Sequence, residues 1–170
     1  MTTEVNENLL DWLNNAHAME QQAETMLKAQ ASRIENYPDL KARIESHIQE
    51  TLGQKELLEG CIARLDGSTS LIKDATGKMM AFAQAVGGST QSDEIIKGAM
   101  AGYVFENLEI ATYTVLIAAA REAGDVETER VCQQIIEQEK AMSAWMLNNL
   151  PGLTKDFLLR DATPGTKAKV

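Results

Sequence analysis

Apolar residues recur every three or four positions along the first third of the chain, which is the pattern of amphipathic helices. The spacing predicts one long helix over residues 8–35 and a second that ends near Gly67, a residue suited to close a helix. Between them, Tyr37 and Pro38 predict a tight turn, because a residue before a proline leaves helical conformation while the proline can open the next helix. The two helices should therefore form an antiparallel hairpin.

The rest of the chain repeats this arrangement after a longer connection. Its predicted segments are a shorter crossover helix over 70–86, a Gly- and Ser-rich linker over 87–93, a third long helix over 94–123, a turn at Gly124-Asp125 and a fourth long helix that stops at Pro151. We expect a helical bundle over residues 1–153. A C-terminal extension over 154–170 should consist of a short helix and then a flexible tail.

Two hairpins joined by a long crossover are the connection pattern of ferritin-like bundles rather than of simple up-and-down bundles. Good helix formers dominate the long segments, and only 3 prolines occur among 170 residues. No stretch alternates β-branched with polar residues over the length of a strand. The sequence predicts an all-α, ferritin-like four-helix bundle of two antiparallel hairpins, with a short crossover helix between the second and third long helices.

Composition limits the choice of partners. The formal net charge is -9, and an acidic surface repels both nucleic acids and anionic membranes. The chain shows no apolar run of membrane-spanning length and no basic and apolar start typical of a signal peptide. We expect a cytoplasmic protein that binds neither nucleic acid nor membrane. Apolar residues of the crossover helix and of the segment 153–159, including Phe157 and Leu158, predict a homodimer, because one bundle does not cover them fully.

Four glutamates interrupt the apolar faces, one in each long helix: Glu20, Glu50, Glu109 and Glu139. The first two are 30 residues apart, as are the last two, and the midpoint of each pair falls at or beside a predicted turn. In an antiparallel hairpin, residues equally far from the turn lie side by side. We therefore expect the four carboxylates at one level of the bundle.

Two further side chains flank this set. His17 and Glu106 occupy equivalent positions, each one turn before the glutamate of its own helix and on nearly the same face. Clustered buried carboxylates need a neutralising partner, because burial of each charge is costly and like charges repel. Protons, divalent metal ions or nearby lysines could neutralise them; the lysines are Lys28, Lys55 and Lys140. Oxygen ligands with one or two imidazoles suit iron or manganese.

The segments around these residues resemble the YciE/YciF family of ferritin-like bacterial proteins, over roughly residues 9–150. The resemblance is carried by AMEQQ at 18–22, HIQETLGQ at 47–54, FENLEIATY at 105–113 and EQEKA at 137–141. It implies the ferritin-like fold, a dimer, a link to bacterial stress responses and a carboxylate site for two metal ions. It implies no defined reaction, so the sequence leaves open whether the protein is an enzyme.

One departure from such sites leaves two hypotheses open. Ferritin-like two-metal sites usually take Glu-x-x-His from two helices, but Gly53 and Met142 stand at the histidine positions here. In the first hypothesis, two iron or manganese ions are held by Glu20, Glu50, Glu109 and Glu139, with Glu106 and His17 as flanking ligands. In the second, the protein is a structural or partner-binding helical bundle whose metal site has degenerated.

Overall fold

The computed structural model describes residues 2–65, 67 and 91–170, so the predicted crossover helix lies outside the described residues. Four long helices make up most of this part of the chain: α1 (Thr2–Arg33), α2 (Pro38–Arg64), α4 (Glu94–Ala123) and α5 (Val126–Asp161). No strand occurs among these residues. The predicted all-α class is confirmed.

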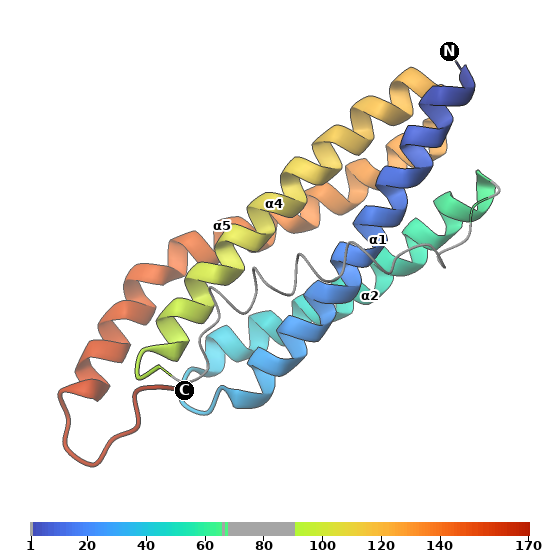
Figure 1. Cartoon of the computed structure of the whole chain (residues 1–170). Coiled ribbons are helices and arrows are strands. Elements are labelled where there is room, and N and C mark those ends of the chain that lie inside the picture. Colours follow the sequence, from blue (N-terminus) through green and yellow to red (C-terminus); the bar gives the residue numbers. More distant parts are fainter. Residues whose placement is uncertain (1, 66, 68–90) are drawn as a thin grey trace.

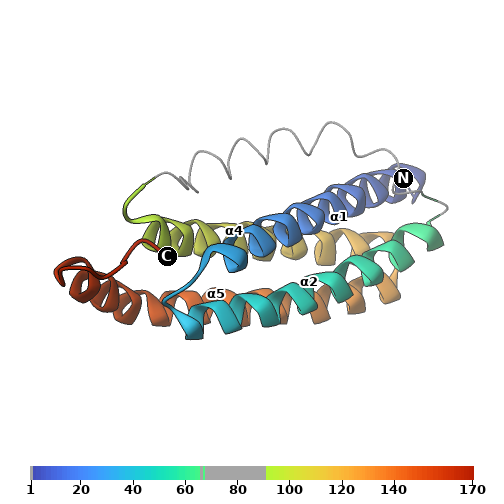
Figure 2. The same cartoon turned by 90° about the horizontal axis from the view of Figure 1, so that it is seen from below.

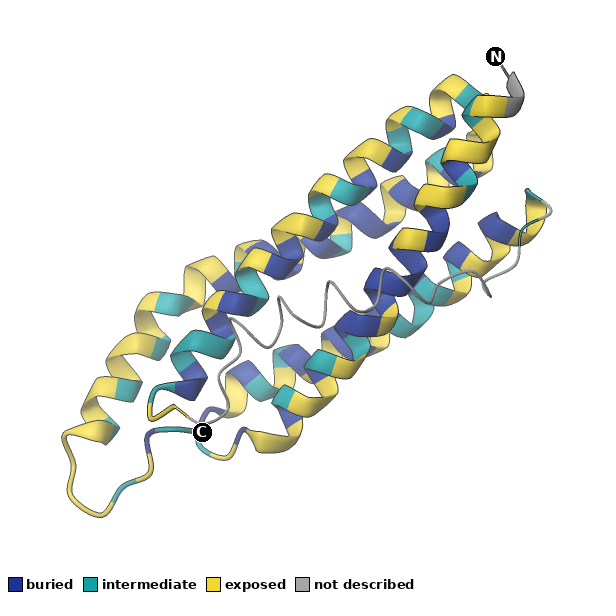
Figure 3. Ribbon diagram, viewed as in Figure 1, coloured by how far each residue is buried: buried dark blue, intermediate teal, exposed yellow. Residues whose placement is uncertain are grey.

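The helices form two antiparallel hairpins, α1 with α2 and α4 with α5 (Figure 1). In addition, α1 packs against α4 and α2 against α5, so the four helices enclose one core. Figure 2 shows α1 and α4 on one side of the bundle and α2 and α5 on the other. Buried positions form stripes on the helix surfaces that face one another (Figure 3), as the three- and four-residue spacing of apolar residues predicts.

Local chemistry sets the two hairpin turns where the sequence predicts them. Pro38 is the first residue of α2. At the other turn, Gly124 follows α4 in the left-handed conformation, with φ of 71°, which glycine adopts without steric cost. The side chain of Asp125 then accepts a hydrogen bond from the backbone N–H of Thr128 at 3.0 Å and caps the start of α5.

The fourth helix does not stop at Pro151, and this corrects the sequence-based prediction. α5 passes through Pro151 and ends at Asp161. A proline inside a helix removes one backbone hydrogen bond. The helix nevertheless continues because Leu153 and Phe157 extend its apolar face and pack against the core. The part of α5 beyond Pro151 is therefore a continuation of the bundle helix rather than a separate short helix.

The last residues also differ from the flexible tail that the sequence predicts. The backbone N–H of Ile95 donates to the carbonyl of Lys169 at 3.1 Å, and the amide of Asn36 donates to the carbonyl of Val170 at 2.6 Å. The hydroxyl of Tyr37 donates to the carbonyl of Ala168, a buried residue. Hydrogen bonds between residues so far apart in the chain leave no periodic signal in the sequence. The tail is fastened to the end of the bundle where α1 meets α2.

Two further expectations concern the surface. Leu158 and Leu159 are each 58% exposed in the single chain, and the homodimer that would cover such residues stays a prediction. Within the part of the chain that the structure describes, no helix combines the length and the apolar character needed to cross a membrane.

Candidate metal centre

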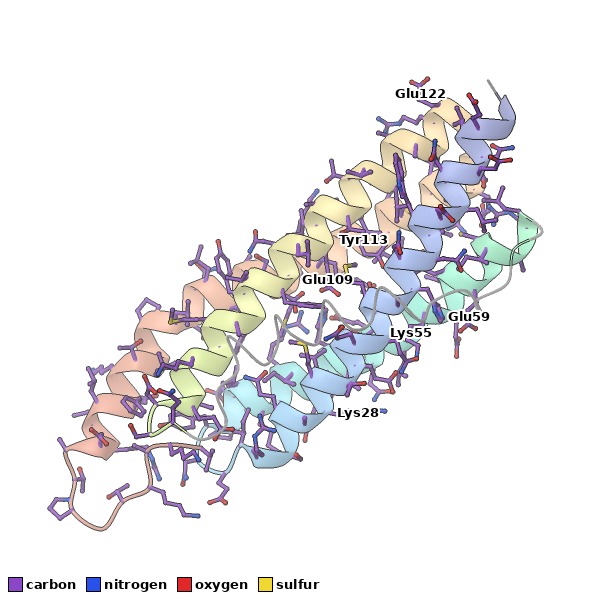
Figure 4. The ribbon with its side chains drawn as sticks, viewed as in Figure 1. Lys28, Lys55, Glu59, Glu109, Tyr113 and Glu122 are labelled. Atoms are coloured by element: carbon purple, nitrogen blue, oxygen red, sulfur yellow. The ribbon has the colours of Figure 1, made fainter. Side chains whose placement is uncertain are left out.

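Four buried side chains meet in the middle of the bundle. His47 of α2, Glu106 and Glu109 of α4, and Glu139 of α5 each offer one ligand atom, and these atoms lie within 4.8 Å of one another. None of the four residues is more than 3% exposed. We name this set the carboxylate–histidine cluster. Figure 4 shows Glu109, together with Tyr113, on the middle of α4.

Helical register explains why these side chains converge. Glu106 and Glu109 are three residues apart in α4 and therefore share one face. On α2, the buried polar residues His47, Thr51 and Gln54 follow one another at four and three residues, which is the spacing of one helix face. Because helices rather than loops carry all these groups, their positions are fixed by the packing of the bundle.

His47 links the cluster to the surface of the bundle. Its Nδ1 lies 2.6 Å from Oε2 of Glu50, and Arg43 approaches the same carboxylate at 3.3 Å. Its Nε2 lies 3.2 Å from Oε2 of Glu106 and 3.3 Å from Oε2 of Glu139. Burial lowers the pKa of His47, but the three surrounding carboxylates outweigh burial and raise the pKa to about 12. In the metal-free protein His47 is therefore a cation.

A carboxylate from α1 completes the set. Glu20 is fully buried, and the hydroxyl of Tyr113 donates a hydrogen bond to its Oε1. On the opposite side, the amide of Gln54 donates to Oε1 of Glu139 and, at 2.9 Å, to Oε1 of Gln138. All four long helices thus contribute polar groups to one level of the core.

Burial changes the proton affinity of three carboxyl groups in this core. The pKa of Glu20 lies well above its ordinary value, mainly because the group is buried and in addition because Glu139 is close. The pKa of Glu109 is also raised well above the ordinary value, by burial and then by the charge of Glu20. Burial raises the pKa of Glu106 to about 7 despite the nearby His47. The metal-free cluster therefore retains protons that exposed carboxyl groups would release.

Several carboxylate oxygens in this core find no hydrogen-bond donor in the described part of the chain when the carboxyl groups are ionised. They are Oε2 of Glu20, Oε2 of Glu106, both oxygens of Glu109 and Oε2 of Glu139. His47 is close to two of them, at ion-pair distance but without hydrogen-bond geometry. A buried polar atom without a partner costs about 1–3 kcal/mol, and a charged one costs more. The site is therefore suited to an additional cation.

The lysines that could have neutralised the cluster bind other residues. Lys28 and Lys55 both form ion pairs with Glu24, and Lys140 pairs with Glu137 at the surface. Among the ion pairs of the described residues, none joins these three lysines to the cluster. Of the three means of neutralisation that the sequence left open, protons and metal ions remain.

The structure brings four of the six predicted site residues to one place: Glu106, Glu109 and Glu139 in the cluster, and Glu20 beside it. Glu50 is the first exception. Its side chain is 28% exposed, and it reaches the cluster only through His47. The reason is the register of α2, in which Thr51 takes the inward position and leaves Glu50 at the edge of that face.

His17 is the second exception. Its Nε2 lies 2.8 Å from Oε1 of Glu59 on α2, whose side chain is 51% exposed. The ring therefore faces the contact between α1 and α2 rather than the centre of the bundle. The match between His17 and Glu106 in the sequence concerns their positions along the helix axis. It carries no information about the direction in which each side chain points. The structure places His17 outside the cluster.

Sequence reasoning left three polar groups out of the predicted site, namely His47, Gln54 and Tyr113. A signal for each was available. His47 and Gln54 continue the inward stripe between the buried residues Ile44 and Leu58, and Tyr113 stands one turn after Glu109. Polar residues that continue an apolar stripe are therefore informative, and a pattern of apolar residues alone does not include them.

Comparison with known proteins gives a clear family match. The family model described as a domain of unknown function, DUF892, matches residues 4–159. The solved structure of a protein from Xanthomonas campestris pv. campestris is 40% identical to this chain. The match covers 94% of this chain and 99% of that one, with a TM-score of 0.81.

More distant structures share the fold. The E. coli stress protein YciF is 21% identical, with 87% of this chain and 95% of that chain covered and a TM-score of 0.72. A structure described as ferritin like, diiron-carboxylate proteins from Bacillus anthracis is 20% identical, with 86% and 97% covered and a TM-score of 0.71. These likenesses confirm the ferritin-like bundle. Together with the family match along most of the sequence, they show that the chain belongs to the DUF892 family, which is the YciE/YciF-like family that its motifs resemble.

Proposed function

We propose that the carboxylate–histidine cluster and Glu20 bind two divalent metal ions, iron or manganese, and that the protein acts in a bacterial stress response. The observation that carries the proposal is the set of buried carboxylate oxygens without hydrogen-bond donors. A cation bound from solution would stabilise these oxygen atoms. Carboxylate oxygens with one imidazole nitrogen suit Fe²⁺ or Mn²⁺ better than they suit soft metals.

Five side chains would hold the ions: His47, Glu106, Glu109, Glu139 and Glu20. Glu50 would support them, because a metal-bound histidine usually donates its second N–H to a carboxylate that fixes the orientation of the ring. The 2.6 Å contact between Nδ1 of His47 and Oε2 of Glu50 is of this kind. Since a histidine binds metal as the neutral imidazole, metal binding would release the proton that His47 holds in the metal-free protein.

Charge balance favours two ions over one. The four carboxylates of the core carry four negative charges when ionised; they belong to Glu20, Glu106, Glu109 and Glu139. Two divalent cations neutralise this charge without any retained proton, whereas a single ion would require two of the four carboxyl groups to keep their protons. Bound iron would supply the chemistry of ferrous-ion oxidation or peroxide removal.

The comparisons support this proposal without testing it. The structure from Bacillus anthracis is described as a diiron-carboxylate protein, and YciF is described as a stress protein. Both have the same bundle as this chain, so a metal site at mid-height of the bundle is consistent with the fold.

One observation favours the second candidate, a structural bundle with a degenerate metal site. Gly53 and Met142 stand where ferritin-like sites usually have histidines, and His47 already provides one internal positive charge. Retained protons would then neutralise the remaining carboxylates. On this reading, metal ions leave the stability of the protein unchanged.

A metal titration separates the two candidates. Chelator-treated protein is mixed with Mn²⁺, or with Fe²⁺ in the absence of oxygen, and its thermal unfolding is followed by calorimetry. At about 100 times the dissociation constant, a ligand specific for the folded state contributes about 2.7 kcal/mol. For a chain of this size we expect the melting temperature to rise by about 5–10 °C. An unchanged melting temperature with both ions would favour the degenerate site.

A further inference from the structure

Two buried cysteines lie in the core at some distance from the carboxylate–histidine cluster. Cys61 of α2 is 1% exposed, Cys132 of α5 is 0% exposed, and both are free thiols. They are the 2 cysteines of the chain, so neither has another thiol of the same molecule as a reaction partner. Neither belongs to the proposed metal site. Their chemistry is therefore independent of metal binding.

The alignment of α2 with α5 places the two cysteines at one level of the bundle. The amide of Gln54 donates to the carboxylate of Glu139, and this contact sets the alignment of the two antiparallel helices. Cys61 follows Gln54 by seven residues, and Cys132 precedes Glu139 by seven residues. Seven residues make almost two full turns, or about 10.5 Å along the axis. Each cysteine therefore lies on nearly the same face as the residue from which it is counted.

A second contact, on the far side of the cysteines, supports this alignment. Nη2 of Arg64 in α2 donates to the hydroxyl of Thr128 in α5 at 2.8 Å, so Cys61 and Cys132 lie between two contacts that join the same helices. Helices whose axes are about 8–10 Å apart bring facing Cα atoms closer than the roughly 7 Å limit for a disulfide. The packing of α2 on α5 is thus compatible with a bond between the two sulfur atoms.

The two sulfur atoms differ in their surroundings. Nη1 of Arg64 lies 3.8 Å from Sγ of Cys61, and a guanidinium in this place stabilises negative charge that develops on the sulfur. The side chain of Arg64 is itself 40% exposed, so the Cys61 sulfur lies one side chain below the surface. Burial, and then the nearby Cys61, raise the pKa of Cys132 to about 12, which keeps Cys132 protonated at neutral pH. Cys61 is therefore the better nucleophile of the two.

We propose that Cys61 and Cys132 are a site of reversible oxidation, at which a peroxide joins α2 to α5 through a disulfide. The Cys61 sulfur attacks one oxygen of hydrogen peroxide, the O–O bond breaks, and one water molecule leaves while Cys61 becomes a sulfenic acid. The Cys132 sulfur then attacks the Cys61 sulfur, the S–S bond forms, and the hydroxyl group leaves with the Cys132 proton as a second water molecule. The two thiols lose two electrons and two protons in total, and one peroxide is reduced to two water molecules.

The disulfide would tie the α1–α2 hairpin covalently to the α4–α5 hairpin. A cross-link stabilises a protein mainly by restricting the unfolded chain, and the effect grows with the length of the loop that it closes. The loop closed here is long, since it runs from residue 61 to residue 132. We expect the oxidised protein to melt about 10 °C above the reduced protein. Added thiol reagents should reverse the change, because disulfides exchange with free thiols.

Peptide mapping after oxidation tests the proposal. Reduced full-length protein, freed of reductant, is treated with a small excess of hydrogen peroxide in the presence of a metal chelator, and the remaining thiols are then alkylated. Trypsin releases the two cysteines in separate peptides, residues 56–64 and 131–140. We expect these peptides to be joined, with a mass lower by two hydrogen atoms than the sum of the free peptides. The oxidised protein should run as a single chain on a non-reducing denaturing gel.

Three variants separate the roles of the two thiols and of Arg64. Cys132→Ser should stop at the sulfenic acid of Cys61, which dimedone traps, while Cys61→Ser should react far more slowly. Arg64→Gln should slow the oxidation of Cys61 several-fold, because the positive charge beside its sulfur is lost. Arg121→Gln is the matched control, since Arg121 also forms an ion pair at the surface, but with Glu129. Thermal unfolding verifies that each variant is folded.

Three results would overturn the proposal: thiols that both remain reduced, oxidation confined to separate sulfinic or sulfonic acids, or disulfides that form only between chains. The metal titration does not bear on this outcome, because the chelator removes metal from the test and neither cysteine belongs to the proposed metal site.

Discussion

Glu139→Gln is expected to lower the affinity of the protein for Mn²⁺ by more than about 100-fold. Loss of a residue that only supports a metal ligand lowers the affinity by up to about 100-fold, and loss of a ligand itself should lower it further. The substitution keeps the size and the hydrogen-bonding oxygen of a residue that is 0% exposed, but it removes one negative charge from the cluster. Isothermal titration calorimetry on chelator-treated protein measures the affinity. The metal-induced rise in melting temperature should disappear at the same Mn²⁺ concentration.

Two companion variants make this result specific. Glu137→Gln is the matched control, because Glu137 lies two residues away on the same helix and its side chain is 70% exposed. It should bind Mn²⁺ as the wild type does. Glu50→Gln should lower the affinity about 10- to 100-fold, since Glu50 acts through His47 rather than on the metal. Equal affinities for all three variants would contradict the proposed ligand set.

The metal-free protein is expected to lose stability as the pH rises from about 5 to 7.5. A carboxyl group with a raised pKa holds its proton more tightly in the folded state, so its contribution is complete below pH 4.5 and falls until the folded-state pKa is reached. For Glu106, the interval from 4.5 to about 7 corresponds to roughly 3 kcal/mol, or about 6–12 °C in melting temperature. Glu20 and Glu109, whose pKa values are raised in the same direction, should increase the loss.

The other groups with shifted pKa values do not reverse this loss of stability at higher pH. The raised pKa of His47 stabilises the folded state below pH 6.5, and that contribution declines as the pH rises toward about 12. The pKa values of Glu24 and Glu50 are lowered by hydrogen bonds, so their contributions are present above pH 4.5 and are lost only at lower pH.

Thermal unfolding at constant ionic strength and several pH values measures this dependence. Metal-free Glu109→Gln should melt at a higher temperature than the wild type at pH 7.5 and should show a flatter pH dependence, because one buried acid is absent. Saturating Mn²⁺ should reverse the slope in the wild type, since metal ions bind the ionised carboxylates. A metal-free melting temperature that rises from pH 5 to 7.5 would contradict the buried cluster.

Local chemistry made much of the fold predictable. The helix α4 begins and ends where the linker and Gly124 predict, and Pro38 opens α2. Such signals reside within a few residues of the position that they determine. The continuation of α5 beyond Pro151 was not predictable in this way. The packing of Leu153 and Phe157 against distant parts of the chain outweighs the local preference of the proline.

The candidate site, like the fold, was predictable only in part. Equal distances from the turns identified the level at which the carboxylates meet, because helix rise is constant. Those distances carry no information about the direction of a side chain around the helix axis. His17 and Glu50 therefore contact Glu59 and His47, respectively, instead of joining the cluster. The inward position on α2 belongs to His47, and only the combined pattern of apolar and polar residues on that helix could have indicated it.

Metal content is the most direct test of the central claim, that the buried carboxylates hold two divalent ions. Wild type and Glu139→Gln are purified without chelators and without metal-affinity chromatography, and their metals are measured by inductively coupled plasma mass spectrometry. We predict about two iron or manganese ions per wild-type chain and a clear loss in the variant. A wild-type protein that contains no more of either metal than Glu139→Gln would contradict the claim.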